Sequence, residues 1–250
     1  MSKHYQELTS RNLGLINPKE QKRIKETTIL FIGCGLGSRI ASLAVRTGYE
    51  NFILCDGDKV ELSNLNRQDF TLSEVGKNKA SETKKKILKI NPRAKVECVN
   101  KFIRDDADIK KLVGKADIVF NMSDPDKAMY KINNEAVKQN KIVFFPINLG
   151  HGGFLLIFTK KSKSLEQILG EKVYGNVFYL KLIEKVFKKM PDSLMKLLST
   201  IDQRVLTGEM PSPQTGVTSY ITSALAVVVM TRYINKENIS LAPIPIFLEP

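Results

Sequence analysis

The sequence of 250 residues has few cysteines, the residues that form disulfides in secreted proteins and bind structural zinc. It contains no tryptophan and three cysteines, Cys34, Cys55 and Cys98, which are widely spaced and include no Cys-x-x-Cys pair. This odd, dispersed set supports neither a disulfide framework nor a thiolate zinc site, so no zinc is expected. Residues 1–7 lack the apolar core of a secretory signal, and we therefore expect a cytoplasmic location.

An uninterrupted apolar run of membrane-spanning length is also missing. The most apolar stretch, residues 217–234, is long enough to span a bilayer, but polar side chains interrupt it at Thr218, Ser219, Thr222, Ser223, Thr231 and Arg232. Membrane insertion requires a continuous apolar stretch, so we interpret this segment as a buried helix and expect no membrane partner.

Charge of one sign is in excess. Lysine and arginine number 39 against 26 acidic residues, a formal charge of +13, which favours polyanionic or acidic partners through the long-range field. The basic residues are scattered and not interleaved with aromatic ones. A lysine-rich solvated surface therefore explains them at least as well as nucleic-acid binding does.

The order of apolar segments predicts an α/β fold. Residues 27–32 are a buried strand, the glycine-rich stretch 33–38 follows, helical spacing resumes over 40–47, and 52–55 form a second strand, which together make one βαβ unit. Alternation of predicted helices and strands continues to residue 145 and is typical of a doubly wound, Rossmann-like parallel sheet.

After Pro146 the pattern changes. Gly150–Gly153 separates two apolar runs, which predicts antiparallel strands added to the sheet. Residues 164–206 have amphipathic helical spacing, a helical insertion, and 244–248 form an edge strand, where a proline is tolerated. We expect one domain over 1–250, with a helical N-terminal segment (1–26), a nucleotide-binding core (27–160) and a helical and edge-strand substrate region (161–250).

Two features of the first βαβ unit indicate a nucleotide. Gly33, Gly35 and Gly37 form a G-x-G-x-x-S loop before a helix, where glycines let phosphate approach unpaired N–H groups. Asp56 ends the second strand, where an acid accepts hydrogen bonds from ribose hydroxyls. The loop alone serves nicotinamide, flavin or ATP equally well.

The stretch from Asp56 to Gln68, DGDKVELSNLNRQ, is more specific. It resembles the D-x-D-x-V-x-x-S-N-L-N-R-Q signature of the ThiF/MoeB/HesA proteins and the related ubiquitin-activating enzymes, matching at every fixed position. Further motifs along the first 160 residues or so are similar to the same family: Arg11–Gly14 with Gln21, Gly76–Ala80, Ile90–Pro92 and Ser123-Asp124.

The resemblance implies an ATP-dependent adenylyltransferase, which joins a carboxylate to AMP, and it assigns roles to residues. Arg67 and Lys79 would neutralise the phosphates, Asp124 would hold Mg²⁺, and Arg11 would reach the triphosphate of the partner subunit in a homodimer. Asn64 and Asn66 would hold the phosphate loop. The implied ATP-binding set is Gly33, Gly35, Gly37, Asp56, Asp58, Asn64, Asn66, Arg67 and Lys79. For Lys79 a competing interpretation is a lysine-studded, solvated helix face.

Departures from the family pattern restrict the chemistry. Family members often have Asp where this chain has Asn121, which leaves the Mg²⁺ site with one fewer candidate acid. No cysteine follows Cys98, so a thioester step, persulfide chemistry and structural zinc are unsupported. Cys34 and Cys55 are interpreted as small packing residues.

We therefore expect activation of the C-terminus of a small sulfur-carrier or ubiquitin-like protein, or of a ribosomal peptide. Three alternatives stay open. A relative that dehydrates a modified nucleoside, threonylcarbamoyladenosine, in tRNA also uses ATP, and the positive charge fits tRNA. A catalytically silent partner subunit is the second. A nicotinamide-dependent oxidoreductase is the third, and the S-N-L-N-R-Q stretch argues against it.

Overall fold

A mixed sheet runs through residues 2–249, which the computed structural model describes apart from the side chains at positions 192, 193, 197 and 206. In that part of the chain the sheet has seven strands in the order β3-β2-β1-β4-β5-β6-β7. The first five in this order are parallel, and β6 and β7 are antiparallel to their neighbours. The strands are β1 (Thr28–Ile32), β2 (Asn51–Cys55), β3 (Lys95–Val99), β4 (Ile118–Asn121), β5 (Ile142–Leu149), β6 (Gly152–Phe158) and β7 (Ile246–Leu248).

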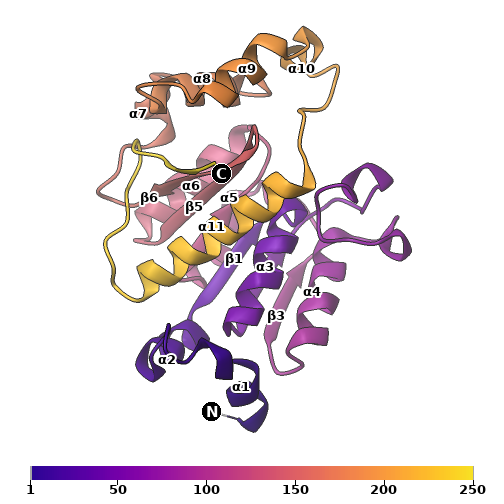
Figure 1. Cartoon of the computed structure of the whole chain (residues 1–250), viewed down its shortest axis with the longest axis vertical. Helices are drawn as coiled ribbons and strands as arrows, with labels where there is room; N and C mark the ends of the chain where they lie inside the picture. Colours follow the sequence, from indigo (N-terminus) through magenta and orange to yellow (C-terminus); the bar gives the residue numbers. More distant parts are fainter. Residues whose placement is uncertain (1, 250) are drawn as a thin grey trace.

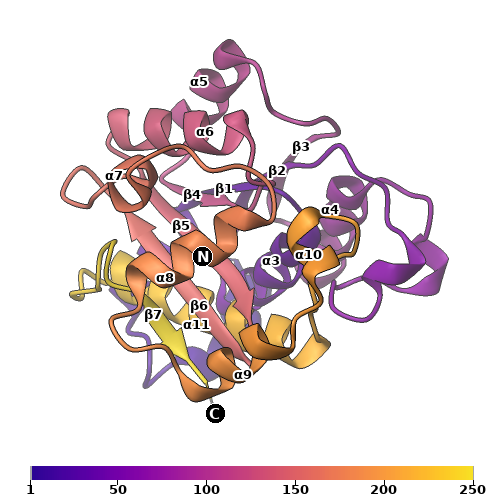
Figure 2. The same ribbon diagram turned by 90° about the horizontal axis from the view of Figure 1, so that it is seen from above.

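Helices cover both faces of the sheet (Figure 1). One face carries α2 (Pro18–Glu26), α3 (Gly35–Thr47), α4 (Lys79–Ile90) and α11 (Gly216–Ile234), and the other carries α5 (Asp106–Gly114) and α6 (Lys127–Lys138). The short α1 (Lys3–Leu8) lies near the N-terminus. Residues 159–215, here called the crossover segment, pass over the carboxyl end of the sheet (Figure 2) and contain α7 (Leu165–Leu169), α8 (Val177–Val186), α9 (Asp192–Thr200) and α10 (Gln203–Thr207).

Capping residues explain where most helices begin. Asn17 accepts hydrogen bonds from the first turn of α2 while Glu20 bonds back to Asn17, a capping box with Pro18 in the first turn. The side chains of Asn78, Asp105 and Asp126 likewise accept hydrogen bonds from first-turn N–H groups of α4, α5 and α6, without a capping box. Helices α4 and α6 follow loops at the carboxyl ends of the strands, so their capped amino ends lie at the edge where the functional site is, whereas α2 lies at the opposite end of the sheet.

The core lies on both faces of β1, β2, β4 and β5, which are buried on both sides, whereas the edge strand β3 is partly exposed. Phe31, Phe120 and Phe144 form a ladder across β1, β4 and β5, with neighbouring ring centroids 5.0 Å apart, and pack under α3 and α11. Leu30 and Val119 face the opposite side, toward α5 and α6. The continuous apolar runs of the sequence reflect this double burial.

The predicted α/β fold with a parallel first half and added antiparallel strands is confirmed. Details differ: β5 extends past Pro146 to Leu149, and β7 begins at Ile246, where the pairing with β6 begins, and not at residue 244. The prediction of a buried helix over 217–234 is right for one face only.

Helix α11 is the one helix in residues 2–249 with the length and composition to cross a membrane. It packs against α3, β5 and β6, and Thr222, Ser223 and Met230 are buried there. Its outer face is exposed at Val217 and Val228. The polar side chains that interrupt the apolar run lie mostly on the packed face, where Thr222 donates a hydrogen bond to the carbonyl oxygen of Thr218.

Candidate functional site

A cavity of about 440 Å³ opens at the carboxyl ends of β1, β2, β4 and β5. A doubly wound sheet binds its ligands at this edge. The cavity brings together eight of the predicted site residues: Gly33, Gly35, Asp56, Asp58, Asn64, Arg67, Lys79 and Asp124. The other three, Gly37, Asn66 and Arg11, do not line it.

The glycine loop has a separate reason for each glycine. Gly33 has φ of +98°, and a Cβ there would lie 2.7 Å from the Met122 carbonyl oxygen. A Cβ at Gly37 would lie 2.9 Å from the Met122 side chain, so glycine permits close packing there. Helix α3 begins at Gly35, earlier than the predicted start at residue 40, and no side chain caps it. Its first N–H groups are therefore available to an anion.

Asp56 holds the glycine loop from the end of β2. One carboxylate oxygen accepts a hydrogen bond from the Cys34 N–H at 2.6 Å and the other from the Asp58 N–H at 2.8 Å. Burial raises the pKa of Asp56 despite these bonds. A raised folded-state pKa means that stability falls as pH rises from the unfolded-state value, so the ionised carboxylate is a cost to folding near neutrality. A ribose acceptor would explain why the acid is present.

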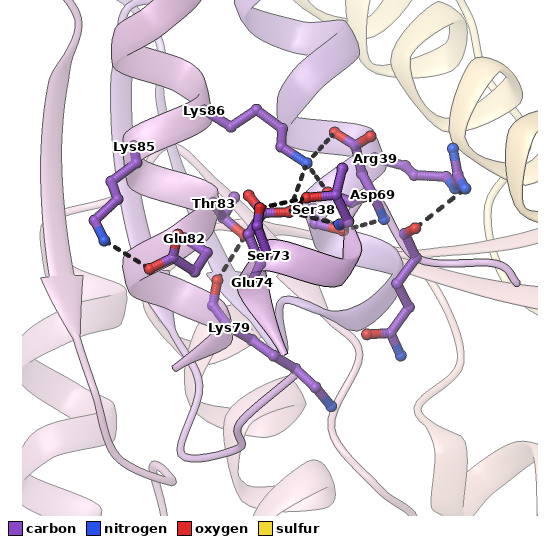
Figure 3. A network of polar contacts seen from close by, with 12 residues as sticks. Ser38, Arg39, Asp69, Ser73, Glu74, Lys79, Glu82, Thr83, Lys85 and Lys86 are labelled. Carbon is purple, nitrogen blue, oxygen red and sulfur yellow. Dashed lines mark hydrogen bonds and ion pairs between the residues drawn. The ribbon is translucent and has the colours of Figure 1, made fainter. Parts of the chain in front are cut away.

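Lys79 lies inside the cavity and not on the solvated face of α4. Its ammonium group contacts the Asp58 carboxylate at 3.1 Å, and its side chain is 10% exposed, against 62% for Lys85. In Figure 3 the Lys79 side chain extends away from Lys85 and Lys86. The interpretation of a lysine-studded surface therefore holds for Lys85 but not for Lys79.

Arg67 is fixed by its own loop. Its guanidinium donates hydrogen bonds to the Ser63 carbonyl oxygen and to Oδ1 of Asn66, both at 2.9 Å. Asn66 in turn donates to the Gln214 carbonyl oxygen at 3.1 Å. Asn66 therefore orients Arg67 and ties the loop to the crossover segment, whereas buried Asn64 accepts a hydrogen bond from the Glu61 N–H.

Arg39 is a positioning residue that no motif indicated. It is buried in α3 and donates to the carbonyl oxygens of Arg67 at 2.5 Å and Gln68 at 3.2 Å. The ring of Tyr220 covers its guanidinium, 4.0 Å from the ring centroid. These hydrogen bonds join residues 28 and 29 positions apart, and their acceptors are backbone carbonyls, which every residue has. No local sequence pattern therefore indicates them.

A network of polar contacts from α3 and α4 also holds the loop that carries Arg67 (Figure 3). The Asp69 N–H donates to the Ser38 hydroxyl at 3.1 Å. Lys86 donates to the Asp69 carbonyl oxygen and contacts the Glu74 carboxylate at 3.9 Å. These contacts hold residues 67–69 against α3 and α4, so the Arg67 guanidinium is presented by a well-anchored turn.

Asp124 and Asn121 point in different directions. Among the described residues no donor contacts the exposed Asp124 carboxylate, which lines the cavity. Asn121 is fully buried and donates to the Met129 carbonyl oxygen at 2.9 Å and to Oδ1 of Asn133 at 2.7 Å. Although Asn121 also borders the cavity, its amide is committed to α6. The absence of an acid here therefore reflects a structural clamp.

Further residues of the cavity escaped the sequence interpretation. Phe102, after β3, is 51% exposed, and its ring lies so close to Gly57 that a Cβ there would be 2.6 Å away. It offers an aromatic face near Asp56. Tyr179 of α8 lines the cavity, and burial together with the nearby Asp124 carboxylate raises its pKa.

Arg11 lies at the opposite end of the sheet. Its neighbour Asn12 donates to the carbonyl oxygen of Thr47, the last residue of α3. Helix α3 has 13 residues and is therefore about 20 Å long, which separates Arg11 from the glycine loop of its own chain. The Arg11 side chain is exposed and has no hydrogen bond or ion pair to the described residues.

The three cysteines are free. Cys34 and Cys55 are buried, and burial raises the pKa of the Cys55 thiol to about 12 and that of Cys34 as well. Such thiols stay protonated and inert near neutral pH, which suits packing residues.

Comparison with known proteins identifies the family, whose model matches residues 9–241. A probable molybdopterin-synthase adenylyltransferase from Porphyra purpurea is 33% identical over 132 residues, 52% of this chain and 34% of that protein. The sulfur carrier protein ThiS adenylyltransferase from Escherichia coli strain K12 is 28% identical over 141 residues, 56% of each protein. The chain thus spans between 34% and 56% of the length of these relatives.

The solved structure of E. coli MccB with ATP superposes with a TM-score of 0.70 at 23% identity, over 96% of this chain and 67% of that chain. This likeness extends the shared fold through the crossover segment. The order of strands, the motif-bearing cavity and the match to the family model agree with the resemblance inferred from the signature. The chain belongs to the ThiF family.

Proposed function

We propose that this chain is an ATP-dependent adenylyltransferase that joins a carboxylate to AMP. The observation that carries the proposal is the grouping of two cations, Arg67 and Lys79, with Asp56 and Asp124 around one cavity beside the free amino end of α3. The curated relatives that match this chain are named adenylyltransferases, which supports the same reaction.

In the proposed step a carboxylate oxygen attacks the α-phosphorus of ATP. The bond from that phosphorus to the oxygen bridging to the β-phosphate breaks, and pyrophosphate leaves with the electron pair. A carboxylate is already ionised at neutral pH, so no general base is needed. Arg67 offers a planar fork to phosphate oxygens and Lys79 a compact charge, and together they stabilise the charge that gathers between the anions.

The donor set fits one Mg²⁺ ion held mainly by the nucleotide. Mg²⁺ takes one or two carboxylates plus phosphate oxygens and water, and Asp124 supplies one uncommitted carboxylate. No group of three His, Cys, Asp or Glu side chains capable of holding a metal occurs in the described residues. When bound, Mg²⁺ would neutralise phosphate charge.

The acyl donor we propose is the C-terminal carboxylate of a small protein or peptide. Relatives are named for molybdopterin synthase and for the sulfur carrier ThiS, and MccB has been solved together with MccA. A tRNA substrate, as in the dehydratase alternative, is favoured only by the net charge of +13.

ATP–pyrophosphate exchange with Mg²⁺ tests the proposal. Exchange should depend on added small proteins or peptides, and Arg67→Ala should reduce it by about 10²–10³-fold because a charge-stabilising donor is lost. Asp124→Ala should raise the Mg²⁺ concentration that half-maximal exchange requires, because a ligand of the ion is lost. Arg93→Ala, at an exposed position away from the cavity, is the control.

ATP turnover with tRNA but no exchange with the peptide pool would replace adenylation of a peptide by the dehydratase activity. Silence with both substrates in the presence of normal ATP binding would leave a nucleotide-binding partner subunit as the better account.

We propose that the chain acts as a homodimer in which Arg11 serves the partner's phosphate site. Support comes from the position of Arg11, which is exposed and lies at the other end of α3 from its own glycine loop. A symmetric pairing would bring each Arg11 to the other copy.

Mixing two inactive variants tests this arrangement. Arg11→Ala and Lys79→Ala homodimers should each lose exchange, whereas a randomly reassociated mixture should regain about a quarter of wild-type activity, because mixed dimers hold one intact site. Sedimentation reports the dimer, and double-labelled samples report subunit exchange. If the labels show that mixed dimers have formed but adenylation activity does not recover, Arg11 does not act across the dimer.

A further inference from the structure

The charged and the uncharged side chains that line the cavity come from different parts of the chain. Every charged side chain that lines it comes from residues 56–126, at the nucleotide end. Among the described side chains, those contributed by residues 145–214 include no Asp, Glu, Lys, Arg or His. The second part therefore offers a ligand no charge partner, in contrast to the first.

The uncharged part is an apolar lobe under the crossover segment. We use this name for the space lined by Ile147, Leu180, Ile183, Leu198, Ile201 and Val205, from β5, α8, α9, α10 and the link between α9 and α10. Ile183 and Val205 are buried, while Leu198 and Ile201 are half-buried at the cavity wall. Figure 2 shows α8 and α9 crossing in front of the strands here.

The amides at the border of the lobe are mostly used to hold its walls. Nδ2 of Asn176 donates to the Val205 carbonyl oxygen at 2.6 Å and joins α8 to α10. Nδ2 of Asn148 donates to Oε1 of Gln214 at 3.0 Å and to the Ser219 hydroxyl at 2.9 Å. One acceptor is left over: Oδ1 of Asn148 is buried and has no partner among the described residues.

Such an orphaned acceptor requires a donor if it is not to cost stability. Asn148 lies on β5 beside Ile147, at the mouth of the lobe, and both residues line the cavity that also holds Asp124. Oδ1 is closed to solvent, so a turn of the Asn148 amide toward the cavity is needed before a backbone N–H of an acyl donor can satisfy it while the side chain of the same residue enters the lobe.

From this arrangement we infer that the acyl donor is a peptide whose C-terminal residue has a large aliphatic or aromatic side chain, which the apolar lobe binds. The inference rests on the proposed adenylation and specifies its substrate. The carboxylate of that residue then lies at the charged end, near Arg67 and Asp124, and the preceding chain leaves past Asn148. A C-terminal glycine would leave the lobe unfilled.

Calorimetric titration tests binding of the C-terminal side chain to the lobe independently of the adenylation reaction. The full chain, with Mg²⁺ and a non-hydrolysable ATP analogue, is titrated with acetylated hexapeptides that differ only in a final leucine or glycine. The leucine peptide should bind at least about tenfold more tightly, because a buried leucine side chain gains apolar contact. Leu198→Asn and, independently, Ile201→Asn should erase the preference. Met195→Asn on the same helix, 55% exposed and outside the cavity, should keep it.

Equal binding of both peptides, or a preference that survives in both lobe variants with native unfolding temperatures, overturns the inference. Tight binding of 4-methylpentanoate, which has the leucine side chain but no amide, assigns the lobe to a free acid and overturns the peptide part. Pyrophosphate-exchange assays distinguish failure of the proposed adenylation from failure of the lobe assignment. Leucine-selective binding without pyrophosphate exchange would contradict adenylation but not the lobe. Pyrophosphate exchange with the glycine peptide and not with the leucine peptide would contradict the lobe assignment but not adenylation.

Discussion

Lys79→Ala is expected to reduce kcat/KM for adenylation by about 10²–10³-fold, because the lost ammonium group stabilises phosphate charge in a partly desolvated site. Folding should be almost unaffected. The carboxylate that loses its partner, Asp58, has a side chain 54% exposed, so water can solvate it. Pyrophosphate exchange and thermal unfolding on the same preparations measure both effects.

Lys85→Ala is the matched control for Lys79→Ala. Lys85 occupies the same helix and also pairs with a carboxylate, Glu82 at 2.7 Å, but its side chain is 62% exposed and lies outside the cavity. Equal activity of the two variants would show that Lys79 contributes nothing at the phosphates and would restore the solvated-surface interpretation.

Asn121→Asp is expected to destabilise the fold by about 3–5 kcal/mol. The substitution would set a carboxylate oxygen against two acceptors that now receive hydrogen bonds, the Met129 carbonyl and Oδ1 of Asn133. Each lost donor leaves a buried acceptor unsatisfied at a cost of about 1–3 kcal/mol, and the raised pKa of the new carboxyl limits the added cost of burying its charge. Thermal unfolding measures the loss.

The pH dependence of that loss identifies its cause. Burial beside acceptors raises the folded-state pKa of the new carboxyl above the unfolded value of about 3.9. The destabilisation should therefore be smallest below about pH 4, where the protonated carboxyl can still donate one hydrogen bond, and grow as pH rises through the folded-state pKa. Asn238→Asp, at an exposed loop position without side-chain hydrogen bonds to the described residues, should show no such trend. A stable Asn121→Asp protein with tighter Mg²⁺-dependent ATP binding would instead place position 121 at the metal.

The parallel half of the sheet was predictable because its signals are local. Doubly buried strands are continuous apolar runs, as in residues 28–32, and glycine, asparagine and aspartate mark the turns and caps between elements. The hairpin between β5 and β6 followed from Gly150–Gly153 for the same reason. Motif spacing also placed Asp56, Asp58, Arg67, Lys79 and Asp124, which meet at one cavity.

The parts that were not predictable depend on contacts between distant residues. Arg39 holds the Arg67 loop through backbone carbonyls 28 and 29 positions away, and such acceptors have no residue type. Helical periodicity over 164–206 indicated helices but not that their apolar faces leave space over β5. The orientation of Asn121 toward α6 depends on Asn133 across 12 positions, so the sequence alone could not distinguish a clamp from a missing metal ligand.

The crossover segment is one continuous stretch of chain between β6 and α11. It supplies most of the lobe wall, whereas the glycine loop, Arg67, Lys79 and Asp124 all precede it. Under the proposed function, the residues that select the acyl donor and those that bind the nucleotide are therefore encoded in separate blocks of the gene. An insertion, deletion or exchange within residues 159–215 would then change which acyl donor binds while the nucleotide site keeps its residues. Replacement of this one segment would be enough to change the substrate.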